Sequence, residues 1–536
     1  MRSVTLLDYG AGNVRSVANA LRRLGCSVKA VERPEDIACA ERLVFPGVGE
    51  FGSMVRVLER RGFLGPLRAY LEANRPFLGI CLGLQVLFEG SEESPGVPGL
   101  GFLRGAVRRF RGRLSVPHIG WNGIRARRPS RLFAGCRGGE KFYFVHSYHA
   151  APDDPSAILA TTDYGEEFAS AVEVGNVVAT QFHPEKSGEV GLRLLRNFVE
   201  AEGSAAAPGA GGSPTRLAKR IVACLDVRPD QRGRLVVTKG DRYDVWEGGA
   251  VRDLGDPVEL ARRYYEEGAD EIAFLNITGF RDVPLEDLPM LEVLRRTSEN
   301  VFVPLAIGGG IRDHLGEDGR TYGAVEVAHE YFRSGADKVS VGSEAVRSVR
   351  EYFLRGNRPG RGPIERISRA YGSQAVVVSI DPRRVYVRSP SEVPQRTVET
   401  EEPGPRGERW CWFQCTVKGG RVGTEIDAIT LARACEDLGA GEILLNSIDR
   451  DGTGRGFDLE LLRAVSDEVS IPVIASSGAG RAEHFSELFQ VTEVEAALAA
   501  GIFHRREVSI AEVKERLAAE GVEVREAPSR SRGRAP

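Results

Sequence analysis

The sequence of 536 residues lacks the features of several specialised protein classes. No apolar run reaches the roughly 20 residues of a membrane-spanning helix, and no basic and then apolar leader precedes the first expected strand. Charges nearly balance at a formal net charge of −3, which argues against a surface whose main task is to bind a polyanion. We therefore expect a cytoplasmic enzyme with small-molecule substrates and no nucleic-acid or membrane partner.

Cysteine and lysine are also sparse. The eight cysteines form no C-x-x-C pair, and the two nearest in sequence, Cys411 and Cys415, lie in an alternating, strand-like run. We expect reduced thiols and no zinc site. Only eight of the 72 basic residues are lysine, so a lysine within a motif is slightly more informative than usual.

The chain is longer than one hydrophobic core usually serves, so two or three domains are expected. The clearest boundary is residues 203–215, a Gly/Ala/Ser/Pro-rich segment with the composition of a flexible linker. It separates a first domain, residues 1–202, from a second, residues 216–526. The Arg/Ser/Pro-rich tail, residues 527–536, is expected to be disordered.

The first domain mixes short apolar runs with helical stretches, which predicts an open α/β sheet. The expected strands are Val4–Leu7, Arg42–Phe45, Pro76–Ile80 and Val177–Phe182. The expected helices are Asn13–Leu24 and Gly83–Phe88.

The second domain repeats a strand–loop–helix unit eight times, which predicts a closed (β/α)8 barrel, a TIM barrel. One helix is expected over Asp256–Gly268, which has an Asp N-cap, a following Pro and a terminal Gly. The expected strands are Arg220–Asp226, Glu271–Asn276, Phe302–Ile307, Lys338–Val341, Ala375–Asp381, Glu442–Asn446, Pro472–Ala475 and Glu495–Ala500.

Two features modify this barrel. The sequence from Gly268 to Asn276 resembles that from Gly439 to Asn446, which indicates two related half-barrels. Three long excursions interrupt the repeat, and loops of such length tend to be functional or disordered. The excursions are Val227–Gly255, Asp313–Tyr322 and Pro382–Gly423.

A cysteine nucleophile is indicated in the first domain. Gly79-Ile-Cys81-Leu-Gly83 follows an expected strand and opens a helix, as in the G-x-S-x-G nucleophile elbow, with cysteine in place of serine. His183 follows a second strand and can serve as the base, with Glu185 as its orienting partner. A buried core thiol is the alternative for Cys81, but the elbow glycines, His183 and the nearby Gln85 favour catalysis.

These motifs give the first domain a specific resemblance. Gly-Ile-Cys-Leu-Gly-Leu-Gln with His-Pro-Glu-Lys resembles the class I glutamine amidotransferases, and Asp-Tyr-Gly-Ala-Gly-Asn, Pro-Gly-Val-Gly and His-Ser-Tyr-His resemble the glutaminase of imidazole glycerol phosphate synthases. The resemblance implies that Gln85 holds glutamine. It also implies that the segment Pro46–Gly49, with Gly47 and Val48, supplies oxyanion-hole donors, although a simple strand-end turn is the alternative.

Two aspartates mark the expected barrel site. Asp226 ends strand 1 and Asp381 ends strand 5, which are opposite each other in an eight-stranded barrel. Barrel enzymes carry out chemistry at the carboxyl ends of their strands, and two facing carboxylates can act as acid and base. Either aspartate alone could instead be a helix N-cap.

Glycine-rich turns predict phosphate binding. Gly308–Gly310 follows strand 3 and Ser477–Gly480 follows strand 7, each before a helix whose N-terminus attracts anions. Two such turns, related by the half-barrel repeat, suggest a substrate with a phosphate at each end. Ser343 after strand 4 and Gly501 after strand 8 would complete the two sites, and Lys239 is a candidate lid lysine or an ordinary solvated cation.

Motifs such as Ala-Asp-Lys-Val-Ser, Ser-Ile-Asp-Pro and Asn-Ser-Ile-Asp-Arg-Asp-Gly resemble the cyclase of the same synthases. The resemblance implies acid–base roles for Asp226 and Asp381. It also implies substrate contacts from Gly309, Gly310 and Gly478, and from Asn276, Asn446, Asp451 and Gly452. Asn276 stands where many two-subunit relatives carry Asp, and Gly342 where Asn is common, which leaves the contacts at strands 2 and 4 less certain.

The expected enzyme hydrolyses glutamine and uses the ammonia to convert a bis-phosphorylated formimino-carboxamide ribonucleotide into imidazole glycerol phosphate and an aminoimidazole carboxamide ribonucleotide. No cofactor is implied, and both activities in one chain remove the need for a partner subunit. A sugar isomerase barrel and a scaffold with a vestigial glutaminase are the alternatives. The first leaves the glutaminase without a purpose, and intact Cys81, His183 and Glu185 argue against the second.

Ammonia would be protonated and lost in water, so an enclosed route through the barrel is expected. Arg220 shares a strand face with Asp226, and Glu442 shares one with Asn446, so both should point toward the barrel axis. Glu271 is out of phase with Asn276, so its direction is less certain. The resemblance implies that these three residues form a salt-bridged gate with Lys338, whereas ordinary rim ion pairs are the alternative.

Overall fold

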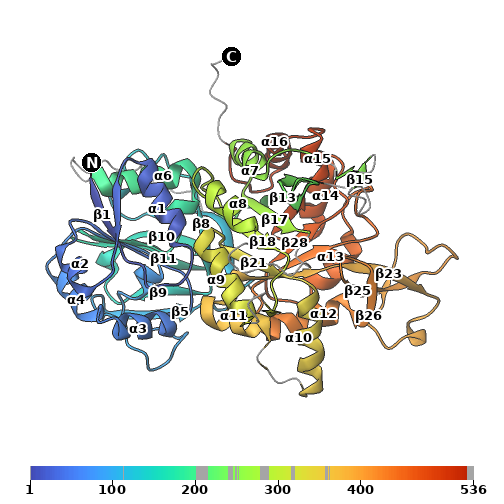
Figure 1. The fold of residues 1–536 in the computed structure, drawn as a ribbon, viewed down its shortest axis with the longest axis horizontal. Coiled ribbons are helices and arrows are strands. Elements are labelled where there is room, and N and C mark those ends of the chain that lie inside the picture. The colour runs from blue at the N-terminus through green and yellow to red at the C-terminus, as the bar shows by residue number, and fades with distance from the viewer. Residues whose placement is uncertain are drawn as a thin grey trace, which may run out of the picture.

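The computed structural model describes residues 2–112, 114–200, 215–238, 253–277, 290–313, 320–356, 360 and 362–527, and the backbone of 246–247, 250–251, 289 and 314–315. Two α/β domains lie side by side (Figure 1). Lys239, nearly all of the expected linker 203–215 and the last nine residues of the expected tail lie outside the described residues.

The N-terminal domain is built on a mixed sheet with the strand order β2-β1-β3-β4-β12-β11-β10-β7. The strands β2, β1, β3, β4 and β12 are parallel, and the remainder is antiparallel. In sheet order the strands are Ser27–Ala30, Ser3–Leu6, Leu43–Gly47, Phe77–Cys81, Val177–Thr180, Glu166–Val174, Ile158–Tyr164 and Arg125–Ala126. Further pairs are β5 (Gly105–Arg109) with β9 (Tyr148–Pro152), and β6 (His118–Gly123) with β8 (Lys141–His146).

The four expected strands of this domain are confirmed, whereas the antiparallel half of the sheet was not predicted. The helices are α1 (Val14–Arg23), α2 (Pro34–Cys39), α3 (Phe51–Arg60), α4 (Leu64–Glu72), α5 (Leu82–Gln85) and α6 (Gly188–Glu200).

Helix α5 is shorter than the expected helix Gly83–Phe88. The carbonyls of Val86 and Leu87 accept hydrogen bonds from the backbone N–H groups of Leu100 and Leu103, at 2.7 and 2.9 Å. Within the chain, the N–H groups of Leu87 and Phe88 bond three residues back, to Leu84 and Gln85 at 3.1 and 3.2 Å, rather than four residues back. The helix therefore gives way to turns after Gln85, and the expectation of a longer helix was wrong.

The C-terminal domain is a closed parallel barrel of eight strands, as the sequence predicts. Pairing of β13 with β29 closes the order β13-β17-β18-β21-β22-β27-β28-β29. Small and branched apolar side chains, including Val222, Ala273 and Leu444, fill the interior. In order the strands are Arg220–Pro229, Glu271–Asn276, Leu305–Gly308, Lys338–Val341, Val376–Ile380, Glu442–Asn446, Val473–Ser476 and Ala496–Ala499.

Helices surround the barrel. The first, α7 (Pro257–Glu266), begins as expected, because the Asp256 carboxylate accepts hydrogen bonds from the N–H groups of Val258 and Glu259. No helix of the described chain is both long and apolar enough to cross a membrane. The others are α8 (Pro289–Thr297), α9 (Ala324–Ser334), α10 (Ser343–Leu354), α11 (Pro363–Tyr371), α12 (Ala428–Asp437), α13 (Leu459–Ser466), α14 (Ala482–Val491), α15 (Gly501–His504) and α16 (Ile510–Ala519).

The longest described insertion is a separate four-stranded sheet that projects from the barrel, drawn in orange at the right of Figure 1. It contains β23 (Pro382–Val387), β24 (Val398–Glu399), β25 (Trp410–Val417) and β26 (Val422–Asp427). The other two excursions contain short strand pairs. In the first, β14 (Leu235–Val237) pairs with β13, and β15 (Trp246–Glu247) pairs with β16 (Ala250–Val251). In the second, β19 (His314–Leu315) pairs with β20 (Thr321–Tyr322).

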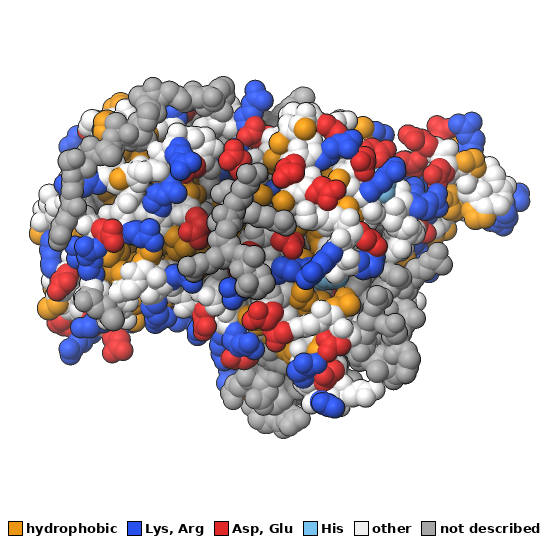
Figure 2. Space-filling model, turned by 90° about the horizontal axis from the view of Figure 1, so that it is seen from above, with side chains coloured by type: hydrophobic (Ala, Val, Ile, Leu, Met, Phe, Trp, Pro, Cys, Tyr) orange, Lys and Arg blue, Asp and Glu red, His pale blue; other side chains and the backbone are white. Residues whose placement is uncertain are grey.

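The N-terminal domain docks on the rim where the barrel strands begin. The Trp121 indole donates to the carbonyl of Asp270, just before β17, at 3.1 Å, and the N–H of Gly188 donates to the carbonyl of Phe302, just before β18. The N–H of Val116 donates to the carbonyl of Ser470, just before β28. Acidic and basic side chains are interspersed over the face drawn in Figure 2.

Candidate active sites

Cys81 stands at the turn between β4 and α5 in a conformation that the elbow glycines make possible. Its φ is 54°, in the left-handed region, and the residue is 5% exposed. A Cβ on Gly83 would lie 2.0 Å from the carbonyl oxygen of Phe45, and one on Gly79 would lie 2.3 Å from that of Gly83. The turn therefore requires both glycines and holds the thiol at the strand end.

His183 and Glu185 form the expected pair beside this thiol. His183 Nδ1 lies 2.8 Å from Glu185 Oε1, and both side chains are buried. Burial disfavours the charged imidazole, but the Glu185 carboxylate and Cys81 outweigh it and raise the pKa of His183 to about 10. A protonated His183 at neutral pH would stabilise a Cys81 thiolate, which is the nucleophilic form.

Two glutamines connect to the nucleophile. Gln85 Nε2 donates to the Tyr148 carbonyl at 3.0 Å and to Gln181 Oε1 at 3.2 Å, and Gln181 Nε2 donates to Cys81 Sγ at 3.5 Å. Gln85 is thus near the thiol, as predicted, with its amide nitrogen already engaged. Gln181 was missed, and its position two residues before His183 was the only signal in the sequence.

In the segment Pro46–Gly49, which is expected to supply oxyanion donors, the backbone of Val48 is hydrogen-bonded to the Tyr9 side chain. The N–H of Val48 donates to the Tyr9 hydroxyl at 3.0 Å, and this hydroxyl donates to the Val48 carbonyl at 2.5 Å. Gly47 packs tightly, because a Cβ there would lie 2.4 Å from Leu82 Cβ. Sequence reasoning missed Tyr9, since nothing in its local pattern indicates this contact.

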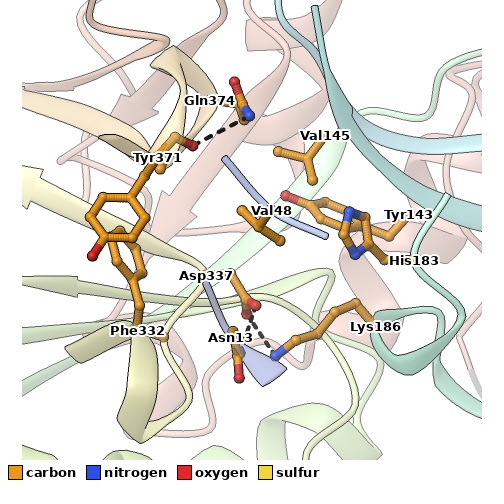
Figure 3. A pocket seen from close by; sticks show the side chains of 12 residues that line it. Asn13, Val48, Tyr143, Val145, His183, Lys186, Phe332, Asp337, Tyr371 and Gln374 are labelled. Carbon is orange, nitrogen blue, oxygen red and sulfur yellow. Dashed lines mark hydrogen bonds and ion pairs between the residues drawn. The ribbon is translucent and has the colours of Figure 1, made fainter. Parts of the chain in front are cut away.

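A pocket between the two domains adjoins the candidate glutaminase site. Figure 3 shows Val48 with His183 and Tyr143 on one side and Tyr371 of the barrel domain on the other. Lys186 Nζ and Asp337 Oδ2 lie 2.6 Å apart across the pocket. The pocket therefore joins the triad residues to the rim of the barrel.

The four residues predicted to form a gate meet in a closed ring at the base of the barrel. Arg220 pairs with Glu271 at 2.9 Å and with Glu442, and Lys338 pairs with Glu271 at 2.6 Å and with Glu442 at 2.7 Å. All four side chains are at most 1% exposed. Burial opposes charge on Glu442, but Arg220 and Lys338 overcome it and lower its pKa.

Cavities lie on both sides of this ring. Tyr143 lines the interdomain pocket, and its pKa is raised by burial and then by the nearby Glu271 carboxylate. On the other side, Glu271 lines a cavity inside the barrel with apolar side chains such as Val222 and Leu444. The ring thus lies between two cavities, one beside His183 and one inside the barrel.

Asp226 lies on β13 and Asp381 directly follows β22, the strand opposite β13 in the barrel, and neither aspartate caps a described helix. The N-cap of α7 is Asp256 and that of α12 is Asp427, so the N-cap alternative was wrong for both. Strand β13 continues beyond Asp226 to Pro229, because β14 pairs with its end. Asp226 therefore lies within β13 rather than at its end.

Asp381 is held in place on several sides. Asn446 Nδ2 donates to its Oδ1 at 2.7 Å, and Ser379 Oγ lies at 3.3 Å. The Thr416 hydroxyl of the inserted sheet donates to its backbone carbonyl at 2.7 Å. Burial raises the pKa of Asp381 despite these hydrogen bonds, so its carboxyl binds a proton more readily than an exposed aspartate.

The predicted phosphate turns have the conformations that glycine favours. Gly309 and Gly310 have φ values of 96° and 78°, and a Cβ on Gly309 would lie 2.2 Å from the Asn276 carbonyl oxygen. Gly478 approaches the Gly456 carbonyl oxygen equally closely, at 2.1 Å for a Cβ. Ser343 begins α10, whereas Gly501 begins the four-residue helix α15.

Three predicted substrate contacts remain: Asp451, Gly452 and Asn276. Asp451 and Gly452 lie in the turn after β27, and the N–H of Asp451 donates to the carbonyl of Ser447 at 3.0 Å. Asn276 faces Tyr331 of α9 rather than the barrel axis.

Comparison with known proteins identifies both domains. Residues 220–509 match the family described as Histidine biosynthesis protein, and residues 5–201 match Glutamine amidotransferase class-I. The imidazole glycerol phosphate synthase hisHF of Arabidopsis thaliana, a chloroplastic protein by name, is 58% identical over 97% of this chain and 89% of its own length. The synthase hisHF of Schizosaccharomyces pombe is 52% identical over 97% of this chain and 99% of its own.

The chain belongs to the single-chain imidazole glycerol phosphate synthases. Both parts of a glutamine-dependent synthase of histidine biosynthesis, a glutaminase and a cyclase, therefore lie in one polypeptide. The synthase subunit HisF of Methanopyrus kandleri is 44% identical over 58% of this chain and 99% of its own length. The expected cytoplasmic location stays a prediction, since the Arabidopsis relative is named as chloroplastic.

Proposed function

We propose that Cys81, His183 and Glu185 carry out the glutaminase reaction of this synthase. The Cys81 thiolate attacks the carboxamide carbon of glutamine, and His183 gives its proton to the departing ammonia. Water then cleaves the thioester with His183 as base, which releases glutamate and restores the thiol. Glu185 holds the imidazole through the 2.8 Å contact to Nδ1, and the segment of Gly47 and Val48 supplies the oxyanion donors.

Asp226 and Asp381 act as the acid–base pair of the cyclase. They lie on opposite strands of the barrel, so a substrate across the mouth can exchange protons with both. The raised pKa of Asp381 supports a role as proton donor. Asn446 orients Asp381 through the 2.7 Å hydrogen bond. It also contacts the substrate that lies between Asp226 and Asp381.

The substrate phosphates occupy the glycine turns on opposite sides of the barrel mouth. One site contains Gly309, Gly310 and Ser343, and the other contains Gly478 and Gly501. The backbone N–H groups of these turns neutralise the phosphates. Lys239, Asp451 and Gly452 complete the set of substrate contacts that we propose, whereas Asn276 is left out of this set because it faces Tyr331.

Ammonia passes from the glutaminase to the cyclase through the ring of Arg220, Glu271, Lys338 and Glu442. The two cavities on either side of this ring are the observation that carries the proposal. Neutral ammonia is small enough to pass between apolar side chains, whereas bulk water would protonate it. Lys338 is the movable member, because its flexible stem ends in a single ammonium group.

The test is an assay of the purified chain with glutamine and the bis-phosphorylated ribonucleotide, with glutamate and imidazole product measured together. We expect both products in a one-to-one ratio. Imidazole product without glutamate release would refute the glutaminase role. Glutamate without imidazole product, together with isomerisation of a sugar phosphate, would support a sugar isomerase instead.

A further inference from the structure

One buried arginine joins the inserted sheet to the barrel. Arg384 lies on β23, three residues after Asp381, and its side chain is 7% exposed. The guanidinium donates to both carboxylate oxygens of Asp458, the N-cap of α13, with Nε 3.1 Å from Oδ2. A further guanidinium nitrogen lies 2.6 Å from Glu460 Oε2. The inserted sheet is thus bound to the first turn of α13, the helix beside it in Figure 1.

The surroundings of Arg384 keep it charged and in one orientation. The guanidinium lies over the ring of Phe413 on β25, 5.3 Å from the ring centroid. Burial opposes its charge, but Asp458 and Glu460 outweigh burial and raise its pKa. Because a bidentate pair between arginine and a carboxylate has a specific geometry, Arg384 fixes where α13 begins relative to the inserted sheet.

The loop between β27 and α13, residues 447–458, is bound to these groups near both of its ends. Near its start, the N–H of Arg384 donates to Asp449 Oδ2 at 2.7 Å. The hydroxyl of Ser447, the first residue of the loop, donates to Oδ2 of Asp458, the last residue, at 3.0 Å. Arg384 therefore holds the loop through its backbone and through the carboxylate that closes the loop.

The inserted sheet also has exposed contacts with this loop. Glu402, between β24 and β25, has its Oε2 3.8 Å from a guanidinium nitrogen of Arg450 and 3.5 Å from one of Arg455. Exposed ion pairs contribute little each, so the buried Arg384 accounts for most of the attachment.

The loop in turn packs on the glycine turn after β28, which belongs to one of the two proposed phosphate sites. The N–H of Gly456 donates to the carbonyl of Gly478 at 2.8 Å. A Cβ on Gly478 would lie 2.1 Å from the Gly456 carbonyl oxygen, and one on Gly480 would lie 2.3 Å from that of Gly454. Since the two backbones are in such close contact, a displacement of the loop would displace the turn.

We propose that Arg384 is a positioning residue for the substrate site of the cyclase, and that the inserted sheet holds the loop of residues 447–458 against the phosphate turn after β28. The loop presents Asp451 and Gly452 to the bis-phosphorylated ribonucleotide, and the turn binds one of its phosphates. Arg384 acts through Asp458 rather than through contact with the substrate. This inference rests on the proposed substrate contacts and gives the inserted sheet a role in binding.

The test is ammonium-dependent cyclisation by the full chain with Arg384→Met, which keeps an apolar stem and removes the guanidinium. We expect KM for the ribonucleotide to rise about tenfold, which corresponds to about 1.4 kcal/mol, while kcat stays within about twofold. Arg350→Met is the matched control and should keep the wild-type KM. Arg350 joins the same sheet to α10 instead, through Glu425 at 2.6 Å.

Asp458→Asn is a second variant that preserves the helix, because asparagine caps as well as aspartate does. It removes the charge that Arg384 binds, so KM should rise by a similar factor. The two substitutions together should add little to either one alone, since they break the same pair. A wild-type KM in Arg384→Met, additive effects in the double variant, or a lower kcat at constant KM would each overturn the positioning role.

Asp451→Asn distinguishes this inference from the proposed function on which it rests. We expect a higher KM in this variant as well, because Asp451 is a proposed substrate contact. If KM rises only in the Arg384 and Asp458 variants, the contact proposed for Asp451 is refuted and the role of Arg384 is supported through the phosphate turn. If KM rises only in Asp451→Asn, the contact stands and the role of Arg384 is refuted.

Discussion

The carboxylate of Asp337 lies 2.6 Å from the ammonium of Lys186, and this ion pair joins the glutaminase triad to the ring at the base of the barrel. Lys186 directly follows Glu185 of the glutaminase, and Asp337 directly precedes Lys338 of the ring. The ion pair thus links the residue next to the glutaminase carboxylate to the residue next to the ring lysine. The predictions below separate the glutaminase, the cyclase and the path between them.

Cys81→Ala should abolish glutamine-dependent synthesis and spare turnover with ammonium salt, because the two chemistries lie in different domains. The measurement is imidazole product formed with each nitrogen source. Cys26→Ala is the matched control, since Cys26 is a buried thiol of the same domain outside the motif. A folded Cys81→Ala variant without ammonium-dependent turnover would contradict this division.

Asp226→Asn should have the reverse effect. The amide has nearly the same shape but cannot exchange a proton, so cyclisation should fall by about 100-fold or more while glutamate release persists. Asp256→Asn is the control, because asparagine caps a helix as well as aspartate does. Substantial cyclase activity in Asp226→Asn would remove this residue from the acid–base role.

Glu185→Gln should lower the pKa of His183, because burial then acts without the opposing carboxylate. The pKa of His183 is about 10 in the folded wild type and roughly 6.5 in the unfolded chain. The pairing of His183 with Glu185 therefore stabilises the fold fully below about pH 6.5. The contribution is lost as the pH rises through about 10. The variant should therefore lose more thermal stability at pH 7 than at pH 10.5, and a pH-independent loss would contradict the account.

Glutaminase kcat measured on the same Glu185→Gln protein should fall by about 100-fold or more, since the base loses its orienting partner. Ammonium-dependent cyclisation should remain, which distinguishes a local effect from unfolding.

Thr416→Val should weaken the cyclase alone. The Thr416 hydroxyl donates to the carbonyl of Asp381 at 2.7 Å, and losing such a hydrogen bond costs about 1 kcal/mol, or roughly fivefold in rate. Thr424→Val is the control, because that hydroxyl donates to the Cys415 carbonyl at 2.9 Å in the same sheet. Equal cyclase losses in both variants would show a general effect on the inserted sheet.

The sequence predicts the barrel well because its strands are covered on both faces and read as continuous apolar runs. The direction of Glu271 was uncertain because its phase was counted from Asn276. The structure shows that Asn276 faces Tyr331 of α9, whereas Glu271, Ala273 and Leu275 line the barrel cavity. Asn276, from which the phase was counted, points away from the barrel axis, and Glu271 points toward it.

Contacts between distant segments could not be predicted. The hydrogen bonds between Tyr9 and Val48 join residues 39 positions apart, and no local pattern in either segment indicates them. Similarly, the turns that follow α5 are bound by backbone donors from a later segment, Leu100 and Leu103. The triad was predictable because strand ends and glycines fix Cys81, His183 and Glu185 through local rules.

Lys338→Ala tests the central claim, passage of ammonia through the ring, most directly. Lys338 lies 2.6 and 2.7 Å from Glu271 and Glu442, so its loss opens the ring and leaves two buried carboxylates with Arg220 alone. Lys338→Met preserves the stem, and Lys514→Ala is the control, because that buried lysine pairs with Asp270 outside the ring. The measurement is the ratio of glutamate to imidazole product in the complete reaction. The account predicts excess glutamate in both Lys338 variants, with ammonium-dependent cyclisation largely intact and a one-to-one ratio in the control. A ratio that stays at one-to-one in the Lys338 variants would contradict the gate and leave the ring a purely structural feature.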